Sequence, residues 1–129
     1  MPVIPTFGDV VASLITYLDA TLPGSPAVTV ASRVPATRPD YLIRLQRTGG
    51  VMHTRVSEKA QVSVDVWAPT EEAAHDLAQD ARVILHNSPG NAAGGVTVYR
   101  VEEIGGPAML PDPLSDSPRF VFTLSVHTR

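Results

Sequence analysis

The chain has 129 residues, of which 43% are hydrophobic, and its formal net charge is −3. This size and apolar content predict one globular domain over residues 1–129 and exclude an intrinsically disordered protein. The absence of cysteine excludes disulfides and thiolate metal sites. The ten basic residues are scattered rather than clustered, which argues against a surface that grips nucleic acid through its phosphates.

The first residues lack the basic and apolar regions of a signal peptide, and no apolar run reaches the ~18 residues of a membrane span. The first predicted element is a helix over about residues 7–21. Thr6 is a candidate N-cap, with Asp9 in the capping-box position three residues later. The apolar residues that follow at helical spacing form one stripe, which consists of Val10, Val11, Leu14, Ile15 and Leu18.

A strand and a β-hairpin are predicted next. Residues 28–34 are rich in β-branched side chains, and residues 41–46 alternate between apolar and polar. Thr48-Gly49-Gly50 is a turn signal, and residues 51–56 would form the returning arm. The sequence therefore predicts a hairpin with the glycine pair at its tip.

The clearest strand in the first half of the chain is predicted over residues 61–67, in which three valines alternate with mostly polar side chains. Thr70 is a candidate N-cap for a second helix, and Glu71 and Glu72 would favour the positive end of its dipole. The apolar stripe of this helix consists of Ala74, Leu77, Ala78, Ala81, Ile84 and Leu85.

Two further strands are predicted, over residues 96–104 and 120–127, with a long proline-rich loop from Gly105 to Pro118 between them. Loops of this length are uncommon in small domains and are often functional or disordered. The order of elements predicts an α+β fold: a two-layer sandwich with a mostly antiparallel four- to five-stranded sheet and two helices packed on one face.

Few side chains suggest chemistry. Glu71 and His75 share a helix face and could begin a metal site, although a solvated face explains them better. The glycine pairs lack nucleotide-binding spacing and are interpreted as turns, and no nucleophile elbow occurs. We therefore predict no cofactor, no metal and no enzymatic activity.

Two features, one on the predicted strand of residues 61–67 and one on the second predicted helix, have open interpretations. Glu72, Asp76 and Asp80 form an acidic stripe, which could be a cation site, an exposed face, or the lining of a channel that repels DNA phosphates. Trp67 lies on the strand face opposite the valines. It is either an exposed interface residue or a residue covered by a loop.

Three stretches together resemble the tail terminators of siphophages, especially those of actinobacteriophages, which are also described as head-to-tail connectors or minor tail proteins. The similarity extends over about residues 6–127. The stretches are Arg47-Thr48-Gly49-Gly50, the segment 64–78 with its VDVWAPTEEAAHDLA sequence, and the YRVEEIGGP segment 99–107 with LPDP at 110–113 and PRF at 118–120.

The resemblance implies a virion protein at the tail–neck junction, made in the host cytoplasm, with no catalytic residues. Copies would form a hexameric ring that caps the tail tube, stops its polymerisation and joins it to the head–neck connector proteins. The major tail tube protein would be a partner, and genome DNA would pass through the channel without specific binding. No membrane contact is implied.

The predicted interface residues lie in the long loop, in the hairpin and at the tryptophan. They are Met109, Leu110, Pro111, Asp112 and Pro113, then Arg47, Thr48, Gly49 and Gly50, and Trp67. The alternatives are a head-closure or adaptor subunit of the same neck, a small cytosolic enzyme or ligand-binding domain, and an interaction module without a ring.

Overall fold

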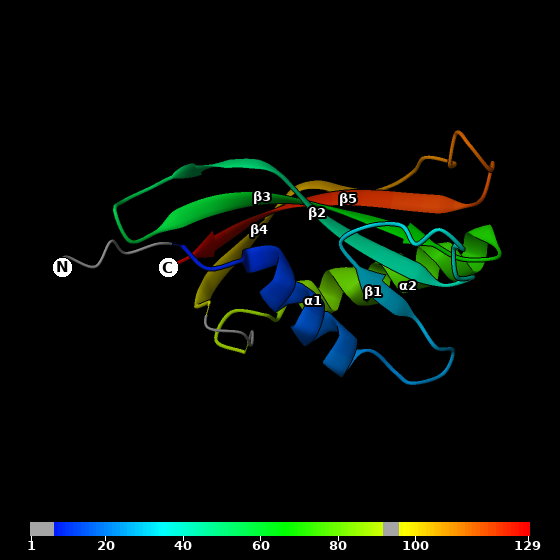
Figure 1. Cartoon of the computed structure of the whole chain (residues 1–129), viewed down its shortest axis with the longest axis horizontal. Helices are drawn as coiled ribbons and strands as arrows, with labels where there is room; N and C mark the ends of the chain where they lie inside the picture. Colours follow the sequence, from blue (N-terminus) through cyan, green and yellow to red (C-terminus); the bar gives the residue numbers. More distant parts are fainter. Residues whose placement is uncertain (1–6, 92–95) are drawn as a thin grey trace.

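Figure 1 shows one sheet with two helices lying along one side of it. The computed structural model describes residues 7–91 and 96–129. In chain order the elements are α1 (Val10–Thr21), β1 (Thr29–Ala31), β2 (Leu42–Met52), β3 (Glu58–Trp67), α2 (Glu71–His86), β4 (Val98–Met109) and β5 (Arg119–Thr128).

The sheet has five strands in the order β1-β2-β3-β5-β4. The short β1 runs parallel to β2, and the other three pairs are antiparallel. Strand β3 is central and pairs with β5 from Glu58 to Trp67. The predicted α+β fold with a mostly antiparallel sheet is thus confirmed, and β4 is an edge strand over its whole length.

The hydrophobic core fills the space between the sheet and the helices. Alternate side chains of β3 and β5 face the helices and are buried: Val62, Val64, Val66, Phe120, Phe122, Leu124 and Val126. Helix α1 contributes Leu14 and Leu18, and α2 contributes Leu85. Each such burial stabilises the fold by roughly 1.5–3 kcal/mol relative to exposure. The predicted apolar stripes therefore do face the core.

Both helix starts are fixed by side-chain caps. Thr70 accepts a hydrogen bond from the N–H of Ala73 (3.1 Å), as the sequence predicts for α2. Helix α1 is capped by Asp9, which accepts from the N–H of Ala12 (3.0 Å). The helix therefore begins at Val10 rather than at residue 7, and the proposed cap Thr6 lies outside the described residues.

The predicted glycine tip of the hairpin is wrong. Gly49 and Gly50 lie inside β2, opposite Gln61 and Ala60 of β3, and the pairing shifts register between Arg47 and Gly49. Both glycines have positive φ, at 145° and 125°. A glycine in such a conformation allows a β-bulge within a continuing strand. The chain turns only after Met52.

The predicted loop from Gly105 to Pro118 is wrong in its first third. Strand β4 continues to Met109, with irregular pairing to β5 on either side of Gly105, and the loop spans only residues 110–118. Pro107 is tolerated there because an edge strand does not need every N–H for a neighbour. Sheet position thus overrides the local turn composition.

Candidate functional site

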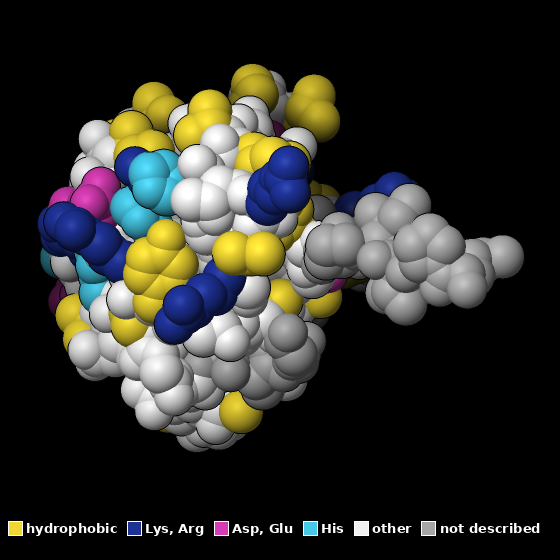
Figure 2. All heavy atoms as spheres, turned by 90° about the vertical axis from the view of Figure 1, so that its left-hand side faces the viewer, with side chains coloured by type: hydrophobic (Ala, Val, Ile, Leu, Met, Phe, Trp, Pro, Cys, Tyr) yellow, Lys and Arg dark blue, Asp and Glu magenta, His cyan; other side chains and the backbone are white. Residues whose placement is uncertain are grey.

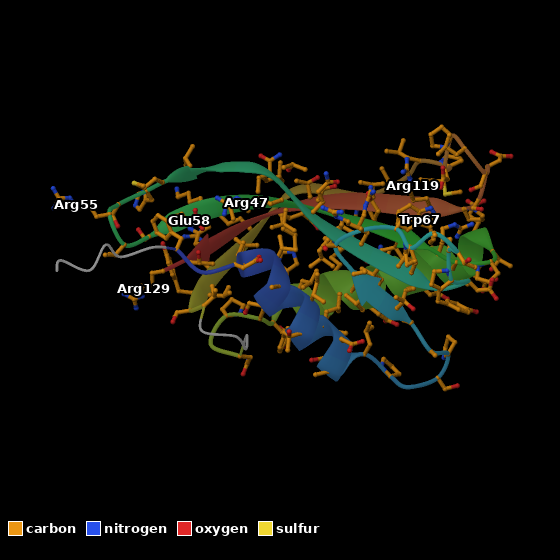
Figure 3. All side chains as sticks on the ribbon, in the orientation of Figure 1. Arg47, Arg55, Glu58, Trp67, Arg119 and Arg129 are labelled. Carbon is orange, nitrogen blue, oxygen red and sulfur yellow. The ribbon has the colours of Figure 1, made fainter. Side chains whose placement is uncertain are left out.

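Trp67 is buried under the loop of residues 110–118, although it lies on the sheet face opposite the helices. Its exposed fraction is 2%, and its indole Nε1 donates a hydrogen bond to Asp112 Oδ2 (3.1 Å). The guanidinium groups of Arg44 and Arg119 lie 5.5 and 5.8 Å from the ring centroid. Figure 3 shows Trp67 and Arg119 close together at one end of the molecule. Of the two interpretations, the loop-covered one is correct.

The loop of residues 110–118 is held in place by hydrogen bonds centred on Asp112. Asp112 Oδ1 accepts from the N–H of Leu114 (2.9 Å), and the Asp112 carbonyl accepts from the N–H of Asp116 (2.7 Å). Arg38 donates to the hydroxyl of Ser117 (2.6 Å). The hydrogen bond from Leu114, followed by that from Trp67, lowers the pKa of Asp112 below its ordinary value. The loop is therefore preorganised rather than merely connecting two strands.

This fixed loop presents an apolar side chain to solvent. Leu114 is 96% exposed, and Leu110 is exposed as well. The predicted residue Met109 instead packs against the core, while Pro111 and Pro113 are exposed. An apolar side chain held outward by an ordered loop is a candidate for contact with another protein, because preorganisation reduces the entropy lost on binding. The sequence prediction missed Leu114, although it follows directly after the predicted LPDP segment.

Arg47 supports the base of the β2–β3 hairpin and does not lie at its tip. Its guanidinium makes two hydrogen bonds to the buried Glu58, of 3.1 and 2.8 Å, and a third to the Gly49 carbonyl. The hydrogen bonding to Glu58 raises the pKa of Arg47. Thr48 donates a long hydrogen bond of 3.4 Å to the Gln61 carbonyl. These predicted interface residues therefore have roles within the chain.

The actual hairpin tip forms an exposed apolar and basic surface, which we call the hairpin end. Its apolar members Val51, Met52 and Val56 are all more than half exposed. Arg129 lies over the ring of Tyr99 (5.8 Å), and both residues line a shallow hollow beside Val56. Figure 3 shows Arg55 and Arg129 at this end, and Figure 2 shows hydrophobic and basic side chains intermixed there.

The three carboxylates of the acidic stripe on α2 are exposed, but they lie in different surroundings. Asp76 and Asp80 line a depression of about 250 Å³ between α2 and the segment after α1. The other lining residues are mostly apolar: Leu22, Pro23, Ser25, Pro26, Val28, Tyr41, Ala73 and Leu77. Glu72 lies in a separate hollow beside His75. The channel hypothesis for the three carboxylates stays a prediction.

His75, the histidine of the candidate metal pair Glu71 and His75, is held by other contacts in the structure. His75 Nδ1 lies 3.2 Å from Asp76 Oδ1, and its ring packs edge-on against Phe120, with 5.6 Å between centroids. Within residues 7–91 and 96–129, no three His, Asp or Glu side chains gather closely enough to hold a metal ion. No helix in the same part of the chain is long and apolar enough to cross a membrane.

Comparison with known families agrees with the resemblance drawn from the sequence. The sequence model of the family described as phage tail termination protein matches residues 4–129, which is nearly the whole chain. No curated protein gives a significant match. The chain therefore belongs to the phage tail termination protein family, a family of structural proteins of the phage tail.

Proposed function

We propose that this protein is a tail terminator that acts as a ring of identical copies. The ring caps the finished tail tube, stops its polymerisation and joins the tail to the head–neck proteins. The observation that carries this proposal is the family match over residues 4–129. The proposed location is the tail–neck junction of the virion, and the proposed number of subunits is six.

The surface of the fold suits an assembly protein. Strand β4 is a free edge, and the preorganised loop of residues 110–118 presents Leu114. The hairpin end and the depression on α2 add two further surfaces on other parts of the chain. A ring subunit needs at least two different neighbour contacts and one contact with the tube. We assign the loop with Leu114 to the tube contact.

DNA passage through the ring requires a bore that does not hold phosphates. Negative carboxylates along a bore would repel DNA and let it slide. Glu72 on α2 is the member of the acidic stripe that lies outside the depression, so it is the best candidate for this role. The head–neck contact would then lie on the side of the ring opposite the tube.

The test is electron microscopy of the protein mixed with purified tail-tube protein. Rings seated on tube ends, together with halted tube growth, are the expected result. A well-folded protein that ignores tube ends but binds the head-side neck proteins would instead identify a head-closure or adaptor subunit. That second function is the nearest alternative, because both subunit types belong to the same joint.

A further inference from the structure

The depression on α2 has the properties of a socket for protein side chains. It is lined mainly by apolar groups, and its lining also includes the carboxylates of Asp76 and Asp80. Its volume of about 250 Å³ lies below the ~300–1,000 Å³ of small-molecule sites. A space of this size accepts one or two apolar side chains. None of the ion pairs among the described residues includes Asp80, so this carboxylate is available to an incoming cation.

The hairpin end has the complementary properties. Met52, Val51 and Val56 offer exposed apolar side chains, and Met adapts well to irregular hollows. In the part of the chain that the structure describes, neither Arg55 nor Arg129 forms an ion pair with a carboxylate side chain. The hairpin end is therefore a projecting apolar surface with unneutralised positive charge.

We propose that the hairpin end of one subunit docks into the α2 depression of the next subunit in the ring. Met52 fills the depression, and Arg55 meets Asp80 at its rim. This inference rests on the proposed ring, and it names the contact that builds the ring. Exposed apolar area is buried at the centre, and opposite charges select the register of the two copies.

Charge distinguishes this occupant from the other projecting surface of the chain. The loop with Leu114 also offers an apolar side chain, but it carries Asp112 and Asp116. Docking it into the depression would bring these carboxylates toward Asp76 and Asp80, and like charges at an interface are strongly unfavourable. The basic hairpin end meets no such repulsion.

The positions of the two surfaces determine the kind of assembly. The hairpin end lies at one extreme of the long axis in Figure 1, whereas the segment after α1 that borders the depression lies toward the other. Two complementary surfaces at different places on one chain make a heterologous contact, which repeats from copy to copy. When it passes from copy to copy, such a contact closes into a ring or continues as a filament, and it stops at a dimer only where two copies exchange it reciprocally.

A charge-exchange experiment on tail-tube ends tests the contact. We expect Arg55→Glu and Asp80→Arg each to reduce the number of rings on tube ends at least about tenfold. Mixing the two variants in equal amounts should restore rings, because each hairpin then meets a depression of opposite charge when the variants alternate. Both residues are exposed, so both variants should fold. Rings that form undisturbed from either single variant, or a mixture that fails to restore them, would overturn the contact.

Disulfide trapping provides a second measurement, which is clean because the chain has no cysteine of its own. Met52→Cys combined with Ala73→Cys in one chain should give a ladder of cross-linked multimers on oxidation at tube ends. Chains with one cysteine can give dimers at most, and Leu114→Cys with Ala73→Cys should also give no ladder. If the wild-type protein forms rings but the Met52→Cys, Ala73→Cys variant gives no ladder, this contact is refuted and the proposed function is not. Wild-type protein that never forms rings would refute the proposed function and this inference together.

Discussion

At the scale of single residues, Trp67 shows what the alternation of apolar and polar residues along a strand predicts, and what it leaves open. The pattern of β3 places this side chain on the face opposite the valines, and the structure agrees. Its cover comes from Asp112, 45 residues further along the chain. No local pattern predicts that a carboxylate so distant accepts the indole hydrogen bond. Burial on this otherwise polar face therefore depends on tertiary structure.

Acidification should weaken the hydrogen bonds that hold this loop on Trp67. Asp112 has a lowered pKa in the folded chain, so its stabilising effect is full above the ordinary Asp value of about 3.9 and is lost as the pH falls through the lower, folded value. Trp67 is the single tryptophan, so intrinsic fluorescence should report a change below about pH 4.

The matched variants for this titration are Asp112→Asn and Asp116→Asn, which lie in the same loop. The first should remove the transition, because an amide does not titrate but can still accept the indole hydrogen bond. The second should keep it. An unchanged transition in Asp112→Asn would show that the carboxylate bonded to Trp67 is not its cause.

At the scale of elements, α2 was predictable because all its signals are local. The cap at Thr70, the acidic first turn and the apolar stripe agree with one another, and the helix runs over Glu71–His86. The start of helix α1 was misplaced, because Asp9, which was assigned to the capping-box position after Thr6, is itself the cap. The β2 glycines had equally strong local signals for a turn, but pairing with β3 on both sides of the bulge decided the outcome.

Alanine at Gly50 should destabilise the protein more than alanine at Gly49. Both positions have positive φ, so both substitutions introduce backbone strain. A Cβ at Gly50 would in addition overlap the Lys59 carbonyl oxygen and lie 2.9 Å from Ala60 Cα, whereas a Cβ at Gly49 meets nothing within 4 Å.

We expect Gly50→Ala to lower the free energy of unfolding by about 1–3 kcal/mol more than Gly49→Ala, because only the Cβ at Gly50 overlaps the paired strand, and relieving such an overlap costs that much. Urea denaturation of the two variants and the wild type measures the difference. If both variants lost the same free energy of unfolding, the bulge would relax around the new side chain. The close approach of β3 would then not explain why position 50 is glycine.

At the scale of the whole molecule, the fold separates a buried core from several outward surfaces. The core faces of the sheet and helices meet each other, and the loop with Leu114, the hairpin end and the α2 depression remain available to partners. This distribution suits a protein that works by assembly, since each surface can serve a different neighbour in the tail.

Leu114→Asp should separate assembly from folding. Because the side chain is 96% exposed, its free energy of unfolding should change by no more than about 0.5 kcal/mol. Binding to tube ends should weaken at least about tenfold if Leu114 anchors the contact. Pelleting with tail tubes measures the binding.

Val83→Asp is the matched control, because it places the same charge at an exposed apolar residue on α2, outside the depression. It should bind tube ends like the wild type. If the wild type and both variants bind tube ends equally well, the loop with Leu114 does not form the tube contact. The proposed hairpin contact between subunits would be unaffected by that result.

The sequence by itself determined the two helices, the alternating core faces, the α+β class and the family. These features follow from periodicities and caps that act within a few residues, or from motifs that can be compared directly. Only the tertiary structure decided where the hairpin turns, how far β4 extends, what covers Trp67 and which residues surround Asp80. Each of these depends on strand pairing or contacts between distant segments, and their energies are not set by local composition.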